Sequence, residues 1–324
     1  MHLAFAIPTP ADTGSGGGAD YIAGLLQSLR DLGHQADLLI GAAPRFPPGA
    51  IPVVDGMLLP SLQPRLDELV GADALALVHH VSAAAGRDQA ARERVRAIEA
   101  DMLPRLRRVV ATSEPVAERL RTEFGVSAHL ALPGARDLPR TVPADDDPVV
   151  LAVGVLTRRK GHDLLLRAMA RLTDLPWRLL IAGDAGREPA HAAELAALID
   201  ELGLQHRAEL LADPSPEALR QAWTSASMFA LATRWEGYPA ASAEALRRGI
   251  PVVTTTEGDP GKLVPSAAGA VVALEDMASF GKCLRRLLFD RDLRRDMAEE
   301  AWQTGQRLPS WRDRANSFAT FLET

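Results

Sequence analysis

The most informative stretch of the chain reads Trp235-Glu-Gly-Tyr-Pro-Ala-Ala-Ser-Ala-Glu-Ala-Leu-Arg-Arg-Gly-Ile-Pro-Val-Val253. Its composition predicts a short Gly-Pro turn, then an alanine-rich helix, then an apolar strand, a succession typical of sheets covered by helices. Glu236 falls in the turn, and Glu244 falls about two helical turns further on. Both carboxylates can therefore face one cleft along the first half of the helix.

The helix start and the two acids suit different parts of one ligand. Free N–H groups and the dipole at a helix N-terminus attract phosphate, whereas carboxylates accept hydrogen bonds from hydroxyl groups. A nucleotide sugar carries both kinds of group and would satisfy Glu236, Glu244 and the helix start together. The alternative is an ordinary amphipathic helix with two solvent-exposed glutamates, and the spacing alone leaves it open.

The same stretch resembles the E-x7-E signature of the family 4 retaining glycosyltransferases. The resemblance is carried by Glu236-Gly-Tyr-Pro239 at one end and by Glu244-Ala-Leu246 with Gly249-Ile-Pro-Val-Val253 at the other. It implies that Glu236 contacts hydroxyl groups of the donor sugar and that Glu244 holds the ribose hydroxyls. The donor site that it implies also includes Gly237, Tyr238, Pro239, Ala240 and Ala241.

Composition agrees with a two-domain enzyme. The 324 residues are 47% hydrophobic, enough for two cores of ordinary size, and the net charge of -6 gives no footprint for nucleic acid. Cys283 is the single cysteine, which excludes an internal disulfide and a cysteine zinc site and favours a reducing compartment. Because no apolar run approaches about 18 residues, we expect a cytoplasmic protein without a transmembrane segment.

Strand and helix patterns alternate twice along the chain, separated by a polar, proline-rich linker from Arg136 to Pro148. Short apolar strands between amphipathic helices are typical of parallel sheets covered on both faces. We therefore expect the α/β GT-B architecture, in which two Rossmann-like doubly wound domains face across a cleft. The expected domains are 1–146 on the acceptor side, with a C-terminal helix 308–324 packing back on it, and 147–307 on the donor side. The predicted strands are 3–7, 36–40, 74–78 and 108–112, then 149–153, 178–181, 208–211, 228–230, 252–254 and 270–272.

The run Asp145-Asp146-Asp147 contains the Asp-x-Asp pattern with which the other large glycosyltransferase fold binds a metal ion. In that fold the pattern follows a buried strand, whereas here it precedes one and is flanked by Pro143 and Pro148. The linker interpretation is preferred. We therefore predict no catalytic metal and no cofactor beyond the nucleotide sugar itself.

Without a metal, fixed cations must neutralise the departing diphosphate. Candidates lie in Gly154-Val-Leu-Thr-Arg-Arg-Lys-Gly-His162, between a predicted strand and the next helix, where doubly wound folds bind ligands. This segment resembles the family's Gly-x-Leu-x-x-x-Lys-Gly loop, which implies that Lys160 pairs with the donor phosphates. Many members carry Arg where this chain has Val155, and either Arg158 or Arg159 is a candidate substitute. A solvated basic loop without a ligand is the alternative.

A glycine-rich run follows the first strand. Gly14, Gly16 and Ala19 satisfy the dinucleotide fingerprint G-x-G-x-x-(G/A), but the loop is too long and proline-rich for the tight turn that the fingerprint needs. The run instead resembles the family's Gly-Gly loop, which implies that the backbone of Gly16, Gly17 and Gly18 approaches the donor diphosphate. Loop packing without ligand contact is the alternative.

His79 and His80 follow the strand 74–78 at its carboxyl end. The resemblance implies that a histidine here reaches the sugar and the acceptor, although Val81 stands where the family usually has proline. His79 is the first candidate and His80 the reserve; Gly258 is a further reserve for the phosphates. We expect Ser113, in the pair Thr112-Ser113, to cap the next helix.

The resemblance implies a retaining, metal-independent transfer with His79, Glu236 and Lys160 as catalytic candidates. Lys160 and a neighbouring arginine would stabilise the leaving diphosphate while the acceptor hydroxyl attacks from the same face. The expected partners are a UDP-, GDP- or ADP-sugar and a small-molecule or glycan acceptor. Two other functions stay open: a nucleotide-sugar 2-epimerase, which needs no acceptor, and a non-catalytic nucleotide-sugar-binding protein.

Overall fold

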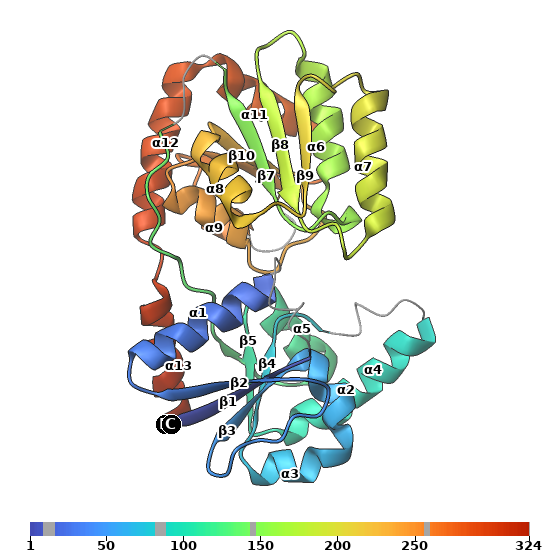
Figure 1. Ribbon diagram of the computed structural model, residues 1–324, viewed down its shortest axis with the longest axis vertical. Helices are drawn as coiled ribbons and strands as arrows, with labels where there is room; N and C mark the ends of the chain where they lie inside the picture. Colours follow the sequence, from blue (N-terminus) through green and yellow to red (C-terminus); the bar gives the residue numbers. More distant parts are fainter. Residues whose placement is uncertain (9–16, 82–88, 143–146, 256–259, 324) are drawn as a thin grey trace. The chain divides into compact units, whose positions relative to one another are not determined.

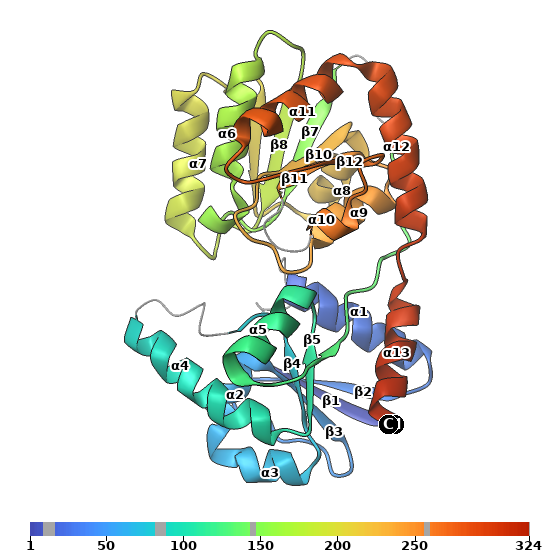
Figure 2. The same cartoon turned by 180° about the vertical axis from the view of Figure 1, so that it is seen from behind.

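A computed structural model describes residues 1–8, 17–81, 89–142, 147–255 and 260–323. The chain forms two compact units, residues 1–134 with 309–324 and residues 135–308. Each unit is built on one parallel six-stranded sheet, with helices on both faces of the sheet (Figure 1, Figure 2).

The sheet of the first unit has the strand order β2-β1-β3-β4-β5-β6, so the chain adds one strand beside β1 and then continues on its other side. The strands are β1 (His2–Ile7), β2 (Gln35–Ile40), β3 (Ile51–Asp55), β4 (Leu75–Val78), β5 (Arg108–Ala111) and β6 (His129–Leu130). The helices are α1 (Gly17–Asp31), α2 (Leu59–Leu62), α3 (Leu66–Gly71), α4 (Gln89–Met102), α5 (Glu114–Phe124) and α13 (Trp311–Glu323).

Successive side chains of β1 face two separate cores, because neighbouring residues of a strand point to opposite faces of the sheet. Phe5 and Ile7 pack in one core with side chains of α1 and α13. Ala6 between them packs in the other core with side chains of α2, α3 and α5. Both faces of the sheet are thus buried, which explains why β1 reads as a continuous apolar run.

The sheet of the second unit has the order β12-β11-β10-β7-β8-β9. Its strands are β7 (Val149–Val153), β8 (Arg178–Gly183), β9 (Ala208–Ala212), β10 (Met228–Leu231), β11 (Val252–Thr255) and β12 (Gly269–Val272). Its helices are α6 (His162–Met169), α7 (Pro189–Glu201), α8 (Pro216–Ser225), α9 (Ala240–Arg247), α10 (Pro260–Leu263), α11 (Met277–Phe289) and α12 (Arg291–Gln306). Val150 and Ala152 of β7 pack in the core of α6, α7 and α11, whereas Val149 and Leu151 pack in the core of α8, α9 and α12.

The last helix, α13, is tied to the first unit by a close aromatic contact. Phe318 and Leu322 of α13 lie in the same core as β1 and α1. The indole of Trp311 lies so close to Gly24 of α1 that a Cβ atom added there would sit 2.4 Å from Cε2 of the ring. The Tyr21 ring packs against the same indole in a T-shaped arrangement, with 5.4 Å between the ring centroids.

This contact predicts that a single methyl group at Gly24 loosens the docking of α13. Gly24→Ala should lower the free energy of unfolding by about 1 to 3 kcal/mol, because overpacking outweighs the better helix propensity of alanine. The matched control is Gly281→Ala in α11, where an added Cβ meets nothing within 4 Å. That change should leave stability equal or raise it by up to about 1 kcal/mol in urea unfolding. Equal stabilities of the two variants would contradict the packing argument.

Candidate functional site

The strand order of the second sheet brings two loops together. The chain leaves β7 for β8 and β9 on one side and later places β10 against the other side of β7. Ligands of doubly wound sheets bind outside the carboxyl ends of the strands where the order reverses. The loop after β7, residues 154–161, and the loop after β10, residues 232–239, both start at this point.

An ion pair joins the two loops. Nζ of Lys160 donates to Oε2 of Glu236, although the two residues lie 76 positions apart in sequence. Only 12% of the Lys160 side chain and 11% of the Glu236 side chain are exposed. Burial lowers the pKa of Lys160 and the charge of Arg159 adds to this, while the Glu236 carboxylate opposes both; the net pKa lies below its usual value. The aliphatic part of Lys160 packs against Gly154, whose added Cβ would lie 3.1 Å from Cε of the lysine.

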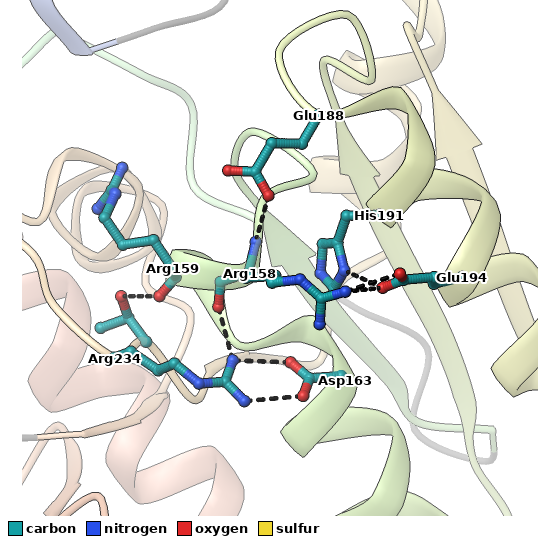
Figure 3. Close-up of polar contacts among 8 residues, drawn as sticks. Arg158, Arg159, Asp163, Glu188, His191, Glu194 and Arg234 are labelled. Carbon is teal, nitrogen blue, oxygen red and sulfur yellow. Dashed lines mark hydrogen bonds and ion pairs between the residues drawn. The ribbon is translucent and has the colours of Figure 1, made fainter. Parts of the chain in front are cut away.

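The structure separates the two arginines between which the sequence could not choose. The guanidinium of Arg158 turns to Glu194 of α7, with Nη2 lying 2.6 and 2.7 Å from the two carboxylate oxygens. Arg159 points in another direction (Figure 3). Its Nη1 donates to the carbonyl of Trp235 at 2.7 Å and lies 3.5 Å from Oε1 of Glu236. Arg159 therefore lies with Lys160 beside Glu236 at the end of the sheet, and Arg158 does not.

Glu236 and Glu244 are engaged by different cations. Glu244 lies within α9, where Nε and Nη2 of Arg248 donate to its Oε1 at 3.0 and 2.8 Å. The Arg248 side chain is nearly buried and its guanidinium lies 5.3 Å from the centre of the Trp223 ring. One third of the Glu244 side chain, 33%, is exposed. The carboxylate is thus oriented from one side and open on another.

The turn before α9 places several predicted donor residues at the helix start. Pro239 occupies the N-cap position, and the helix begins at Ala240, so Ala240 and Ala241 belong to its first turn. Tyr238 accepts a hydrogen bond from the backbone N–H of Ala240 at 2.9 Å. First-turn N–H groups have no intrahelical acceptor, so this end of α9 favours an anion. Gly237 lies in the same turn, next to Glu236.

In the first unit, three neighbouring strands end in polar residues that meet. Asp55 ends β3, His79 follows β4 and Thr112 follows β5. Nδ1 of His79 lies 3.2 Å from Oγ1 of Thr112, and Nε2 lies 3.8 Å from Oδ2 of Asp55, beyond hydrogen-bond distance. The Tyr21 ring packs against the imidazole in a T-shaped arrangement, with 5.2 Å between the ring centroids. Burial lowers the pKa of His79 to about 4, so the imidazole is neutral at neutral pH. The contact with Asp55 is therefore made by a neutral ring.

Comparison with known proteins shows to which family the chain belongs. Residues 136–304 match the model of the family described as Glycosyl transferases group 1. The chain belongs to this family of glycosyltransferases. A D-inositol 3-phosphate glycosyltransferase of Mycolicibacterium smegmatis is 33% identical over 197 residues, 58% of this chain and 45% of that protein. The amylovoran biosynthesis glycosyltransferase AmsD of Erwinia amylovora is 32% identical over 155 residues, covering 48% and 42% of the two chains. The match thus spans less than half the length of these two glycosyltransferases.

Solved structures confirm the predicted GT-B class. A sucrose-phosphate synthase of Thermosynechococcus elongatus has a TM-score of 0.83 at 19% identity, covering 100% of this chain and 98% of that one. Alr3699/HepE of Anabaena, solved in complex with UDP-glucose, has a TM-score of 0.79 at 16% identity, covering 100% and 99%. At such identities the likeness establishes the fold of this chain and not its substrates.

Several of the expected site residues lie outside the described part of the chain. Gly16, Gly258, Asp145 and Asp146 lie outside the described residues, whereas Asp147 is exposed just before β7. Gly17 and Gly18 open α1, and His80 follows His79 at the end of β4.

The described residues bear on metal binding and on membrane insertion. No group of three or more His, Cys, Asp and Glu that could hold a metal ion occurs among them. The same residues contain no helix long and apolar enough to cross a membrane. Independence from metal stays a prediction.

The sequence interpretation missed Asp55, Asp163 and Arg234. Asp55 has a recognisable signal, since an acid directly follows the apolar residues Ile51 to Val54 at a strand end. The other two contact each other across 71 positions of sequence, which no local pattern reveals.

The low pKa of His79 predicts a specific loss of stability in mild acid. The imidazole titrates near 6.5 when unfolded but near 4 in the fold. Between these values the unfolded state binds a proton that the native state does not, so stability is complete above pH 6.5 and falls toward pH 4. The shift corresponds to about 3 kcal/mol. In urea unfolding from about pH 7 to about pH 4, His79→Gln should lose about 2 to 3 kcal/mol less than the wild type.

This test compares how the stability of the two proteins changes with pH, not their absolute stabilities. His162 in the second unit also has a pKa of about 4, owing first to burial and then to the charge of Lys160. Its contribution is common to both proteins and cancels in the comparison. Parallel stability curves for wild type and His79→Gln would show that His79 is not the group that resists protonation.

Proposed function

We propose that this glycosyltransferase moves a sugar from a nucleotide-diphosphate sugar to an acceptor hydroxyl, with retention of configuration and without a catalytic metal. The observation that carries the proposal is the placement of Lys160 and Arg159 beside Glu236, where the second sheet reverses its strand order. Two fixed cations suit a departing diphosphate, and a carboxylate beside them suits sugar hydroxyls. UDP is the first nucleotide to test, because the structural relative Alr3699/HepE was solved with UDP and glucose and with UDP-glucose.

The proposed reaction breaks the bond between the anomeric carbon and the diphosphate oxygen, and the acceptor oxygen bonds to the same face of that carbon. Lys160 and Arg159 stabilise the negative charge that grows on the leaving diphosphate. The acceptor proton passes to an oxygen of the leaving phosphate, so the products are the glycoside and the nucleoside diphosphate. Glu236 accepts hydrogen bonds from donor-sugar hydroxyls and Glu244 from the ribose.

His79 takes a different role in this proposal. An imidazole with a pKa of about 4 is neutral at neutral pH, so it keeps one N–H donor and one acceptor nitrogen but takes up a further proton poorly. It therefore suits a hydrogen bond to a hydroxyl group rather than general base catalysis. We assign it, in the first unit, to the acceptor or to the transferred sugar.

The function is tested with UDP-, GDP- and ADP-glucose in the presence of EDTA, using inositol 3-phosphate as the first of a panel of sugar and polyol acceptors. That acceptor is chosen because the relative from Mycolicibacterium smegmatis is named for it. We expect the release of one nucleoside diphosphate per glycoside, detected by mass spectrometry. An epimerised donor without glycoside would instead indicate a 2-epimerase, and donor binding without any product would indicate a binding protein. A requirement for added magnesium or manganese would contradict metal independence.

We call Lys160 and Arg159 together the phosphate clamp. The proposed role of Lys160 in this clamp predicts a loss of rate when its side chain is changed. Lys160→Ala should lower kcat by about 100-fold or more, because the ammonium contributes most as the leaving group gains charge. Lys160→Arg should recover only part of the rate, since the guanidinium is larger and its charge is spread. The control is Lys282→Ala, an exposed lysine of α11. If the Lys160→Ala rate stays within a few-fold of the Lys282→Ala rate, Lys160 is not part of the phosphate clamp.

A further inference from the structure

One residue, Arg234, holds two consecutive carbonyl groups of the turn that carries the candidate phosphate clamp. Its backbone N–H donates to the carbonyl of Arg159 at 2.8 Å. Its Nη1 donates to the carbonyl of Arg158 at 2.6 Å (Figure 3). These bonds reach the backbone of the turn, so they fix the turn whatever its side chains bind.

Asp163 in the first turn of α6 holds the guanidinium in place. Its Oδ1 and Oδ2 accept from Nη1 and Nη2 of Arg234, each at 2.8 Å, which is the two-pronged geometry that only arginine offers a carboxylate (Figure 3). Burial raises the pKa of Asp163, but the hydrogen bonds and charge of Arg234 outweigh it, and the net pKa lies below its usual value. Asp163 is therefore a charged carboxylate at neutral pH.

The orientation of this turn decides which cation faces Glu236. Residues 158–160 form a single 3-10 turn, and its side chains diverge. Arg158 points to Glu194 of α7, whereas Arg159 and Lys160 point to the loop after β10. A rotation of the turn about its axis would exchange these directions. The carbonyls that Arg234 holds are those of the first two residues, so its bonds oppose that rotation.

We propose that Arg234 and Asp163 form a brace that aims Arg159 and Lys160 at the donor diphosphate, and that both are positioning residues rather than ligands of the substrate. The inference rests on the proposed transfer reaction and extends it to residues that no motif marks. The pair is partly exposed, 37% for Arg234 and 25% for Asp163, so we expect the brace to matter for geometry more than for global stability.

The test combines three variants with a matched control. Arg234→Lys keeps the charge but cannot bond both carboxylate oxygens and the Arg158 carbonyl, and Asp163→Asn keeps the shape but loses the charge. The third variant carries both changes. The control is Arg220→Lys, which alters an exposed arginine paired with Glu217 on α8 of the same unit. Displacing a catalytic group by about 1 Å can cost about 100-fold in rate, so each brace variant should lower kcat by about 10- to 100-fold.

The double variant should be no slower than the slower single variant. Either single change already breaks the interaction between Arg234 and Asp163, so the second change has nothing further to remove. Acceptor KM and thermal unfolding should match those of Arg220→Lys. Multiplicative rate losses in the double variant would show that Arg234 and Asp163 act independently and would overturn the brace. So would turnover within three-fold of wild type in both single variants.

Hydrogen exchange tests, without any substrate, whether the brace holds the turn in place. Amide exchange in residues 157–161 should speed up at least about ten-fold in the Arg234→Lys and Asp163→Asn proteins and stay unchanged in Arg220→Lys, because the brace limits local opening of the turn. Unchanged exchange in the brace variants would overturn the proposal. If the wild type turned over no donor, the proposed function would fail, whereas the exchange result would still show whether the brace exists.

Discussion

A buried ion pair between two loops is the constraint on which the second unit's candidate site depends. Lys160 and Glu236 are both nearly enclosed, and a buried cation that loses its partner is strongly unfavourable. The strand order makes the pair possible, because β10 returns to lie against β7 after β8 and β9 have been placed on the other side. In the proposed reaction the donor diphosphate supplies a second anion to Lys160, so Glu236 can turn its oxygens to sugar hydroxyls without leaving the lysine uncompensated.

The Lys-Gly sequence has a structural cause besides its fit to phosphate. Gly161 has a φ of 67° and ends the turn of Arg158 to Lys160 just where α6 begins. A Cβ atom there would lie 1.8 Å from the carbonyl oxygen of Ala232, after β10. Any other residue would push the turn away from β10 and with it Lys160 from Glu236. The glycine thus permits the close approach of the two loops, and that approach permits their ion pair.

Local sequence patterns predicted the fold and part of the candidate site. Apolar runs between helices predicted ten of the strands, and the position of Lys160 after one of them placed it at the sheet end. Ser113 caps α5 as expected, accepting from the N–H of Val116 at 3.4 Å. The strand β3 was missed, because Pro52 lies inside it and proline usually argues against a central strand. With β3 unseen, the acid at its end, Asp55, had no predicted neighbour.

Long-range side-chain contacts could not be read in the same way. The sequence left Arg158 and Arg159 equivalent, since both follow the same strand, and the choice depends on Glu194 and Trp235, which are distant in sequence. Burial also decides charge in a way that residue type does not. At Lys160 the adjacent Glu236 carboxylate opposes the cost of burial, while at His79 burial lowers the pKa to about 4 and the ring stays neutral. In the proposed reaction, a histidine with a pKa of about 4 is too weak a base to take the acceptor proton at neutral pH. The proposal therefore gives that proton to the leaving phosphate, whose charge grows as the bond breaks and which lies on the face that the acceptor attacks when configuration is retained.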